Sequence, residues 1–511
     1  MLIFIYLTSQ IVQGIINYNL FMKIFLIFIR DESFYHLLPQ KGSKKEQGGK
    51  IKIMAFPPLG IQVLAPVLRM RGQEVHMFDT CHPEMKLEHI KQAADIEKPG
   101  VFALSLLSIT SFQELKKMAL GLKTHAPRIQ IIVGGPFANK NAMNILKDCS
   151  YIDCVGRGEG EELLPEYLDH IDHPGEIAGL TWRDGEKIIH NPQRALILDL
   201  DQFPYPDRKS LPIEYIESLP LDVPAVLSLD RFCTIQTSRG CPFHCIYCDI
   251  PTLNGGKWRS RSPEHVLGEM QQLNDEGYRS IYFTDDHFLM KEKRIQAICQ
   301  GIIDRKLKFR WGCEGRVDSL GVSQLSIMVK ANCKTLAYGV ESGTQKILDR
   351  LKKRQTLSQV EHAIKEAKKH GIETVHGFFV IGSPDEKEED ILESFRFAAR
   401  LNLDSFGFNR LSVYRGTPLW EEYVQRRLID DERDWDRWFR CSEIDPTVLP
   451  GDVVHQLRKK GYTLLFKHLA LHHPVRTFRL LRKFSRHMRW SDLSKLLFSP
   501  FRKFKTNTEV V

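Results

Sequence analysis

Short apolar runs alternate along the chain with longer stretches in which apolar residues recur every three or four positions, the spacing of one face of a helix. In the first third of the chain the runs predict strands over residues 23–29, 74–78, 101–107, 129–133 and 151–155, and the stretches predict helices over residues 58–71, 87–96, 112–124, 142–147 and 161–171. Strands and helices that alternate at these lengths form a parallel sheet with helices on both faces. We therefore expect an α/β domain with a Rossmann-like, doubly wound parallel sheet over residues 22–175.

A second alternation follows a hairpin that turns at Asp184 and Gly185 and a proline-stiffened linker, which together occupy residues 176–223. The later apolar runs predict strands over residues 232–235, 280–284, 311–316, 335–339, 374–381 and 402–413. Between them lie helical patterns, including one with Ser262 as its N-cap and Pro263 in its first turn. Repeated βα units predict a partial TIM (β/α)6 barrel over residues 224–440, with its active site at the carboxyl ends of the strands.

The two ends of the chain depart from this pattern. Residues 1–21 carry no charged side chain, but Gln10, Gln13 and Asn17 interrupt the apolar run, so we interpret them as an extension before a start at Met22, with a membrane anchor as the alternative. Residues 441–511 predict a basic helical region that interleaves Lys and Arg with aromatic residues: Phe466, Phe478, Phe484, Trp490, Phe498, Phe501 and Phe504. The favoured interpretation is a helical cap on the barrel; the alternative is peripheral contact with an anionic membrane or a lipid-like substrate.

Composition indicates the cellular compartment of the protein and the partners to expect. The 511 residues leave room for two or three domains, and the odd number of 11 cysteines without a convincing signal peptide indicates a reducing, cytoplasmic compartment, with membrane association through the basic tail as an addition. The net charge of +9 lies at the end of the chain, because residues 451–511 contain 14 Lys and Arg but 3 Asp and Glu. Since the rest is slightly acidic, we expect no nucleic-acid partner.

Candidate chemistry concentrates in the loop after the strand at residues 232–235. Cys241, Cys245 and Cys248 follow one another at the spacing C-x3-C-x2-C, and soft thiolates at such spacing favour zinc or an iron–sulfur cluster. A closed site would need a fourth protein ligand, which the local sequence does not supply. Three ligands leave one metal position open, which favours catalysis. His244 inside the loop is interpreted as a solvated or hydrogen-bonded residue.

This motif, with Tyr247 just before the third cysteine, resembles the cluster loop of the radical S-adenosylmethionine (SAM) enzymes. The resemblance implies a [4Fe-4S] cluster held by the three cysteines, with SAM bound at the open iron and contacted near Tyr247. It also implies an electron donor, a reductase or a flavodoxin or ferredoxin. A zinc knuckle or three unrelated thiols is the alternative.

Four strand ends further along the chain match positions that this family uses to hold SAM. Asp285 and Asp286 fall where a carboxylate would meet the SAM amino group, and Glu341, in Gly-Val-Glu-Ser-Gly, resembles the residue that accepts from the ribose hydroxyls. Arg316 would bind the SAM carboxylate or pair with Asp318 or Asp286. Gly382 ends the strand that resembles the adenine-contacting one. Each residue has a structural alternative, as a capped strand end or a structural ion pair.

Two strand ends in the first domain resemble the cobalamin-binding domain. Ser105-x-Leu107 is followed at the family's spacing by Gly134-Gly135. The serine would bond the nucleotide tail of cobalamin, and the glycines would let the backbone approach a bulky ligand. The family's D-x-H-x-x-G motif is missing, since Asp31 and His36 have the wrong spacing, so no histidine from that motif would replace the lower ligand of cobalamin. The alternative is a Rossmann-like scaffold without cobalamin.

Together these resemblances imply a B12-binding radical SAM enzyme that methylates an unactivated carbon of a small-molecule or lipid-like substrate, with cyclisation or ring contraction as further outcomes. One alternative is a methylthiotransferase of RNA or protein, which should bring three more cluster cysteines, whereas Cys81, Cys149 and Cys154 lie in the wrong context. Another is a non-catalytic iron–sulfur protein.

Overall fold

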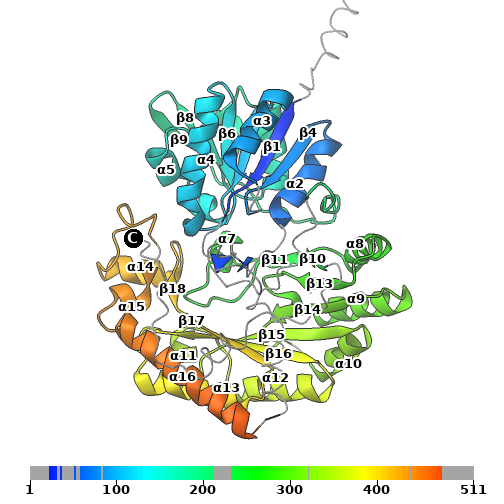
Figure 1. The fold of residues 1–511 in the computed structure, drawn as a ribbon, viewed down its shortest axis with the longest axis vertical. Coiled ribbons are helices and arrows are strands. Elements are labelled where there is room, and N and C mark those ends of the chain that lie inside the picture. Colours follow the sequence, from blue (N-terminus) through cyan, green and yellow to red (C-terminus); the bar gives the residue numbers. More distant parts are fainter. Residues whose placement is uncertain are drawn as a thin grey trace, which may run out of the picture. The chain divides into compact units, whose positions relative to one another are not determined.

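The computed structural model describes residues 22–30, 35–36, 51–52, 58–81, 85–211, 232–319, 321–437, 439–472 and 474 (Figure 1). The chain divides into two compact units: residues 1–32 with 58–213, and residues 33–57 with 214–511. The predicted extension at residues 1–21 lies outside the described residues, as does most of the predicted loop between the first strand and the first helix.

The first unit contains a seven-stranded sheet in the order β4-β1-β5-β6-β7-β8-β9. The strands are β1 (Lys23–Phe28), β4 (Glu74–Asp79), β5 (Val101–Ser105), β6 (Gln130–Gly134), β7 (Cys154–Gly156), β8 (Leu180–Asp184) and β9 (Lys187–His190), and the helices are α2 (Leu59–Met70), α3 (Leu87–Glu97), α4 (Phe112–His125), α5 (Pro136–Asp148) and α6 (Gly160–Asp169). The first five strands pair in parallel, which confirms the predicted Rossmann-like fold, and the predicted hairpin extends the sheet as its antiparallel β8 and β9.

Burial explains why these residues form this sheet. Strand β1, which lies between β4 and β5, is apolar after Lys23, with Ile24, Phe25, Leu26 and Ile27 all buried, as expected for a strand covered on both faces. The strand β4 lies at the edge and alternates buried with half-buried residues. Helices α2 and α6 cover one face, where their side chains share a core with the sheet.

Several boundaries in this unit differ from the prediction. The helix predicted at residues 142–147 begins earlier, at Pro136. Gly135, with a φ of +108°, forms the turn between the strand and the helix, and proline is favoured in a first helical turn. The strand predicted to reach residue 107 ends at Ser105, and Leu107 is 37% exposed. The strand predicted at residues 151–155 begins later, at Cys154, and is β7.

The second unit contains a six-stranded parallel sheet whose spatial order, β10-β13-β14-β15-β16-β17, follows the chain order. This is the predicted (β/α)6 partial barrel. Its strands are β10 (Phe232–Ile235), β13 (Ser280–Phe283), β14 (Arg310–Gly315), β15 (Cys333–Glu341), β16 (Thr374–Ile381) and β17 (Ser405–Arg410), and the helices between them are α7 (Ile250–Leu253), α8 (Pro263–Asp275), α9 (Glu292–Asp304), α10 (Val322–Lys330), α11 (Gln345–Arg350), α12 (Leu357–Lys369) and α13 (Glu388–Arg400).

Alternate residues of these strands face opposite sides of the sheet. Ile281, Trp311, Leu336 and Phe379 belong to one core with side chains of the surrounding helices, which lie along one side of the sheet in Figure 1. The residues between them therefore face the other side, called here the inner face. Polar residues on the inner face and at the carboxyl ends of the strands are the ones available for chemistry.

Short strands and a helical region complete the second unit. The strand predicted at residues 402–413 is divided, because β18 (Ser412–Val413) leaves the sheet and pairs with β19 (Phe439–Arg440). Two more ribbons join β2 (Tyr35–His36) to β3 (Ile51–Lys52) and β11 (Ser238–Arg239) to β12 (Arg259–Ser260). The remaining helices are α14 (Pro418–Gln425), α15 (Cys441–Ile444) and α16 (Gly451–His472).

The helix α16 packs on α13, where the Tyr462 ring lies 5.4 Å from that of Phe395. This agrees with the predicted helical cap, while the tail aromatics from Phe478 onward lie outside the described residues. Among the helices that the structure describes, none is long and apolar enough to cross a membrane.

Candidate functional site

Two carboxylates at the end of β13 fasten the cysteine loop. Asp285 is buried and accepts hydrogen bonds from the backbone N and Oγ1 of Thr237 and from Oγ of Ser238. Asp286 accepts from the backbone N of Gly240 at 2.7 Å. Gly240 has a φ of +85°, and a Cβ there would lie 2.0 Å from the carbonyl oxygen of Lys257. The loop can therefore turn only at a glycine, and Asp285 is used to hold it.

The three thiols of the loop are free and lie close enough to influence one another electrostatically. Burial raises the pKa of all three, that of Cys248 to about 12, and the neighbouring thiols add to the rise for Cys241 and Cys248. A bound metal centre would remove this cost, because it stabilises thiolates.

The donor set consists of three soft thiols within eight residues of one loop. Such ligands suit an iron–sulfur cluster, and also zinc if a fourth ligand is added.

Glu341 forms a buried ion pair at the end of β15. Its Oε1 accepts from Nζ of Lys353 at 2.7 Å, and both side chains are at most 10% exposed. Burial, followed by the Glu341 carboxylate, holds the pKa of Tyr247 well above its usual range, and that carboxylate is hydrogen-bonded to Tyr247. Glu341 has a φ of +68°, a conformation that non-glycine residues adopt only when their surroundings impose it.

Lys353 is a site residue that the sequence did not reveal. It stands between Lys352 and Arg354, both exposed, so the run of three basic residues resembles a solvated surface. In the structure both neighbours have a positive φ, near 50°, which turns Lys353 inward. The available signal was Gly339, where a Cβ would lie 2.5 Å from Oε1 of Glu341 and 2.8 Å from Nζ of Lys353.

Arg316 contacts the backbone of Lys353. Its Nε and Nη2 donate to Asp318, one of the two pairings expected for it, and Nη2 also donates to the carbonyl oxygen of Lys353 at 2.7 Å. The guanidinium stacks 3.9 Å above the ring of Phe243 in the cysteine loop. Its Nη1 is buried and has no hydrogen-bond partner among the described residues, so one donor remains for an anionic group.

Gly382 ends the next strand, β16, with a φ of +77°. Its backbone N and that of Ser383 donate to Oε2 of Glu386, a buried side chain that no motif in the sequence marks. Burial raises the pKa of Glu386 to about 8. The turn is therefore held by a carboxyl group, and the conformation of Gly382 depends on that group.

The candidate cobalamin residues meet at the carboxyl ends of two adjacent strands in the first unit. Ser105 pairs with Gly134 across β5 and β6, and the backbone N of Leu106 donates to the carbonyl oxygen of Gly134 at 2.7 Å. A Cβ on Gly134 would meet no atom within 4 Å, whereas one on Gly135 would lie 2.6 Å from the oxygen of Leu106. The open backbone at Gly134 fits a bulky ligand at this edge, and Leu107 is exposed beside it.

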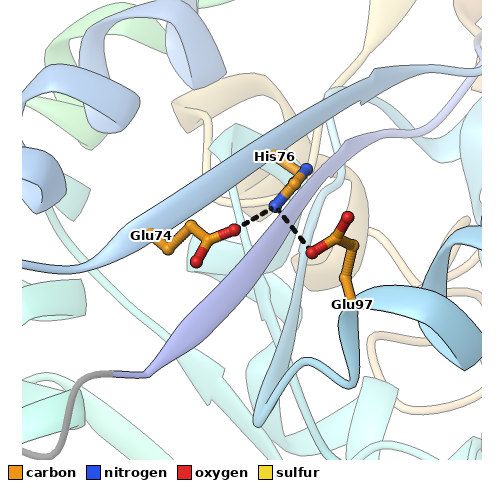
Figure 2. A group of neighbouring side chains, drawn as sticks. All are labelled: Glu74, His76 and Glu97. Carbon is orange, nitrogen blue, oxygen red and sulfur yellow. Dashed lines mark hydrogen bonds and ion pairs between the residues drawn. The ribbon is translucent and has the colours of Figure 1, made fainter.

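Another group of potential metal ligands lies at the amino-terminal part of β4 and the end of α3. His76 lies within 4 Å of carboxylate oxygens of both Glu74 and Glu97 (Figure 2). Nζ of Lys23 occupies the same place, 3.4 Å from Glu74 and 2.7 Å from Glu97, so the carboxylates already have a cation. We interpret this group as a structural ion network.

The two units match different family models. Residues 235–398 match the model of the radical SAM superfamily, and residues 54–168 match the model of the B12 binding domain. The first range contains the three cysteines and every candidate SAM residue, and the second contains Ser105, Leu107, Gly134 and Gly135.

Several relatives match most of the chain. It is 29% identical to an uncharacterized methyltransferase of Pyrococcus horikoshii, over 83% of this chain and 93% of the relative, and 24% identical to the anaerobic magnesium-protoporphyrin IX monomethyl ester cyclase of Cereibacter sphaeroides, over 84% and 70%. Among solved structures, the radical SAM methyltransferase TsrM of Kitasatospora setae, with cobalamin and a [4Fe-4S] cluster bound, shares the fold with a TM-score of 0.65 and 16% identity, over 79% of this chain and 75% of that one.

Proposed function

Because the chain belongs to the radical SAM superfamily and carries a B12 binding domain, we propose that it is a cobalamin-dependent radical SAM enzyme that methylates a carbon atom of a small molecule. The observation that carries the proposal is the pair of strand-end sites in one chain: the three-cysteine loop of the second unit and the open Gly134 turn of the first. Neither a lone iron–sulfur carrier nor a zinc protein needs the second site.

The residues divide the work as follows. Cys241, Cys245 and Cys248 hold the [4Fe-4S] cluster. Asp286 and Arg316 receive the amino and carboxylate groups of SAM, since Arg316 keeps one buried donor without a partner. When bound, the cluster and SAM supply the one-electron chemistry that activates a C–H bond, and cobalamin supplies the methyl group.

Further residues orient these groups. Lys353 fixes the carboxylate of Glu341 through Oε1, and Tyr247 bonds the same carboxylate. Both contacts hold the carboxylate in the orientation in which it would accept from the ribose hydroxyls of SAM. Gly382 presents backbone to the adenine ring. Asp285 positions the cysteine loop and does not contact SAM.

The first unit would hold cobalamin by backbone approach at Gly134 and Gly135, with Ser105 at its nucleotide tail and Leu107 packed beside it. The domain boundaries proposed for this arrangement are residues 22–175 and 224–440. We further propose a cytoplasmic reductase, flavodoxin or ferredoxin as the electron donor and, for the basic tail, peripheral contact with an anionic membrane. Cyclisation is the second candidate reaction, because one relative is a protoporphyrin ester cyclase.

The test replaces one cluster ligand. Cys245→Ala should abolish cluster assembly and the reductive cleavage of SAM to 5′-deoxyadenosine, because no other cysteine of the loop can take its place. The measurement is anaerobic reconstitution followed by iron analysis and a deoxyadenosine assay with SAM and dithionite.

Cys81→Ala, which removes a half-buried thiol from the first unit, is the matched control and should keep both signals. A Cys245→Ala protein that still cleaves SAM would contradict the assignment of the cluster.

A further inference from the structure

The inner face of the six-stranded sheet carries a row of four residues that the proposed function does not use. The strand register aligns Glu314 with Ala337, Ala337 with His376, and His376 with Ser405, on β14, β15, β16 and β17. Successive strands are about 4.8 Å apart, so two hydrogen-bonding side chains, Glu314 and His376, stand on either side of a small one.

His376 is buried, with 4% of its surface exposed, yet half of its hydrogen-bonding capacity is unused. Its Nδ1 lies 2.8 Å from Oγ of Ser405, while Nε2 has no partner among the residues that the structure describes. A buried ring nitrogen without a partner costs free energy, so native proteins satisfy such atoms with a ligand or an ordered water.

No side chain lies next to Nε2 of His376 on the neighbouring strand, because residue 407 is glycine. A Cβ on Gly407 would lie 3.8 Å from Nε2 of His376 and 4.0 Å from Cδ1 of Phe378, which are ordinary contact distances. The space beside Nε2 therefore matches one side-chain carbon. The half-exposed ring of Phe378, 4.4 Å from the imidazole and tilted edge to face, forms an apolar wall.

Glu314 provides a second polar group in the same row. Tyr282 donates its hydroxyl to Oε1 of Glu314 at 2.7 Å, which holds this carboxyl group in place in the row. Burial raises the pKa of the Glu314 carboxyl and lowers that of His376 to about 4, so the row disfavours charge. A charged group brought here would be desolvated without an opposite charge in the row.

We propose that the substrate binds on this inner face as an uncharged, ring-bearing alcohol, with its ring on Phe378 and its hydroxyl at Nε2 of His376 beside Gly407. This inference rests on the proposed function and names the substrate class of that enzyme. A hydroxyl fits because it both donates and accepts, whichever tautomer His376 adopts. Glu314, across Ala337, binds a second polar group of the same molecule.

The test uses full-length protein without cofactors, labelled with ¹³C at histidine Cε1, and cyclohexanol as the probe. Cyclohexanol should shift the His376 resonance, which His376→Gln identifies by its loss, in a saturable way. Cyclohexylamine and cyclohexanecarboxylate, the cationic and anionic analogues, should bind at least tenfold more weakly.

Two variants locate the binding. Gly407→Ala fills the space beside Nε2 without a clash and should weaken cyclohexanol binding at least tenfold while the melting temperature stays unchanged. Thr335→Val, a near-isosteric change two residues before Ala337 on the same face, should bind cyclohexanol like the wild type. Should Gly407→Ala melt early, Phe378→Ala replaces it, with the same expected loss.

The outcomes separate this inference from the function on which it rests. No shift of His376, an equal response to the charged analogues, or undiminished binding by Gly407→Ala and Phe378→Ala would overturn the inference. Cleavage of SAM by the reconstituted wild type is measured in parallel. Cleavage without a response to cyclohexanol rejects this substrate class alone, whereas absence of cleavage rejects the proposed function.

Discussion

Single residues in this protein are held in costly states where the candidate cofactors would bind. Glu341, Lys352 and Arg354 all have a positive φ, and the result is one buried ion pair, Lys353 with Glu341. A buried pair contributes little stability by itself, because desolvation offsets the attraction between the charges. Its retention beside the cysteine loop is better explained by the position that it gives to the carboxylate.

Removing Lys353 from this pair should reveal the free-energy cost of burying the Glu341 charge. Lys353→Met leaves the buried Glu341 carboxylate without a cationic partner, and we expect the free energy of unfolding to fall by about 3–5 kcal/mol. Urea unfolding of the cofactor-free protein, followed by circular dichroism, measures it.

The exposed neighbour supplies the control, since Lys352→Met should change stability by less than about 0.5 kcal/mol. Adding Glu341→Gln to Lys353→Met should recover part of the loss. Equal stability of Lys353→Met and wild type would show that Glu341 is not buried as an ion.

Glu386 predicts a dependence of stability on pH. Its pKa is about 8 in the folded protein against about 4.5 unfolded, so between these values the folded state binds more protons. The free energy of unfolding should therefore be highest at or below pH 4.5 and fall as the pH rises toward 8, and Glu386→Gln should flatten that fall. Urea unfolding at pH 5, 6.5 and 8 tests this.

Glu388→Gln, at the exposed start of α13, serves as the matched change and should keep the wild-type slope. A Glu386→Gln protein with the same slope as wild type would assign the pH dependence to other groups.

At the scale of elements, the turns after parallel strands determine what can bind. The turn after β6 contains two glycines with different constraints: Gly135 is forced by its φ of +108° and by the oxygen of Leu106, while Gly134 is free of both. Steric necessity explains Gly135, and only an approaching ligand gives Gly134 a reason to lack a side chain.

This difference predicts opposite results for two neighbouring substitutions. Gly135→Ala should destabilise the first unit by about 1–3 kcal/mol, because alanine does not tolerate that backbone conformation. Gly134→Ala should leave the melting temperature unchanged but reduce retention of hydroxocobalamin after gel filtration.

Gly60→Ala, at a helical glycine whose Cβ would also meet no atom within 4 Å, should preserve both stability and retention. If Gly134→Ala retains cobalamin as well as wild type, the cofactor does not approach this backbone.

Considered as a whole molecule, the protein consists of two units, each with its own sheet and its own core. The candidate cluster ligands belong entirely to one unit and the candidate cobalamin residues to the other. Loading of one cofactor should therefore not require the other.

Cluster-free protein tests this separation. The full-length Cys245→Ala variant should retain hydroxocobalamin as wild type does, and Gly134→Ala should assemble a full complement of iron. The absorbance of bound cobalamin and iron analysis give the two readouts. Loss of cobalamin together with the cluster would mean that one site depends on the other.

The sequence determined the fold class, because strand and helix periods depend on local order, and it located the cysteine loop and the glycine turns, because few residue types suit a thiolate ligand or a positive φ. The predicted sheets, the hairpin and the carboxyl-end location all follow from such local rules. The sequence determined element boundaries less well. The start of α5 at Pro136 is an example, because Gly135 serves both as a turn residue and as the N-cap of the helix.

Only the tertiary structure decided how side chains from distant strands share their partners. In the sequence Lys353 resembles a surface lysine, but in the structure it is buried against Glu341. Asp285 resembles a ligand of the cofactor, but in the structure it accepts three hydrogen bonds from the cysteine loop. His376 beside Gly407 has no local signal at all, because strand register, which is a long-range property, brings them together.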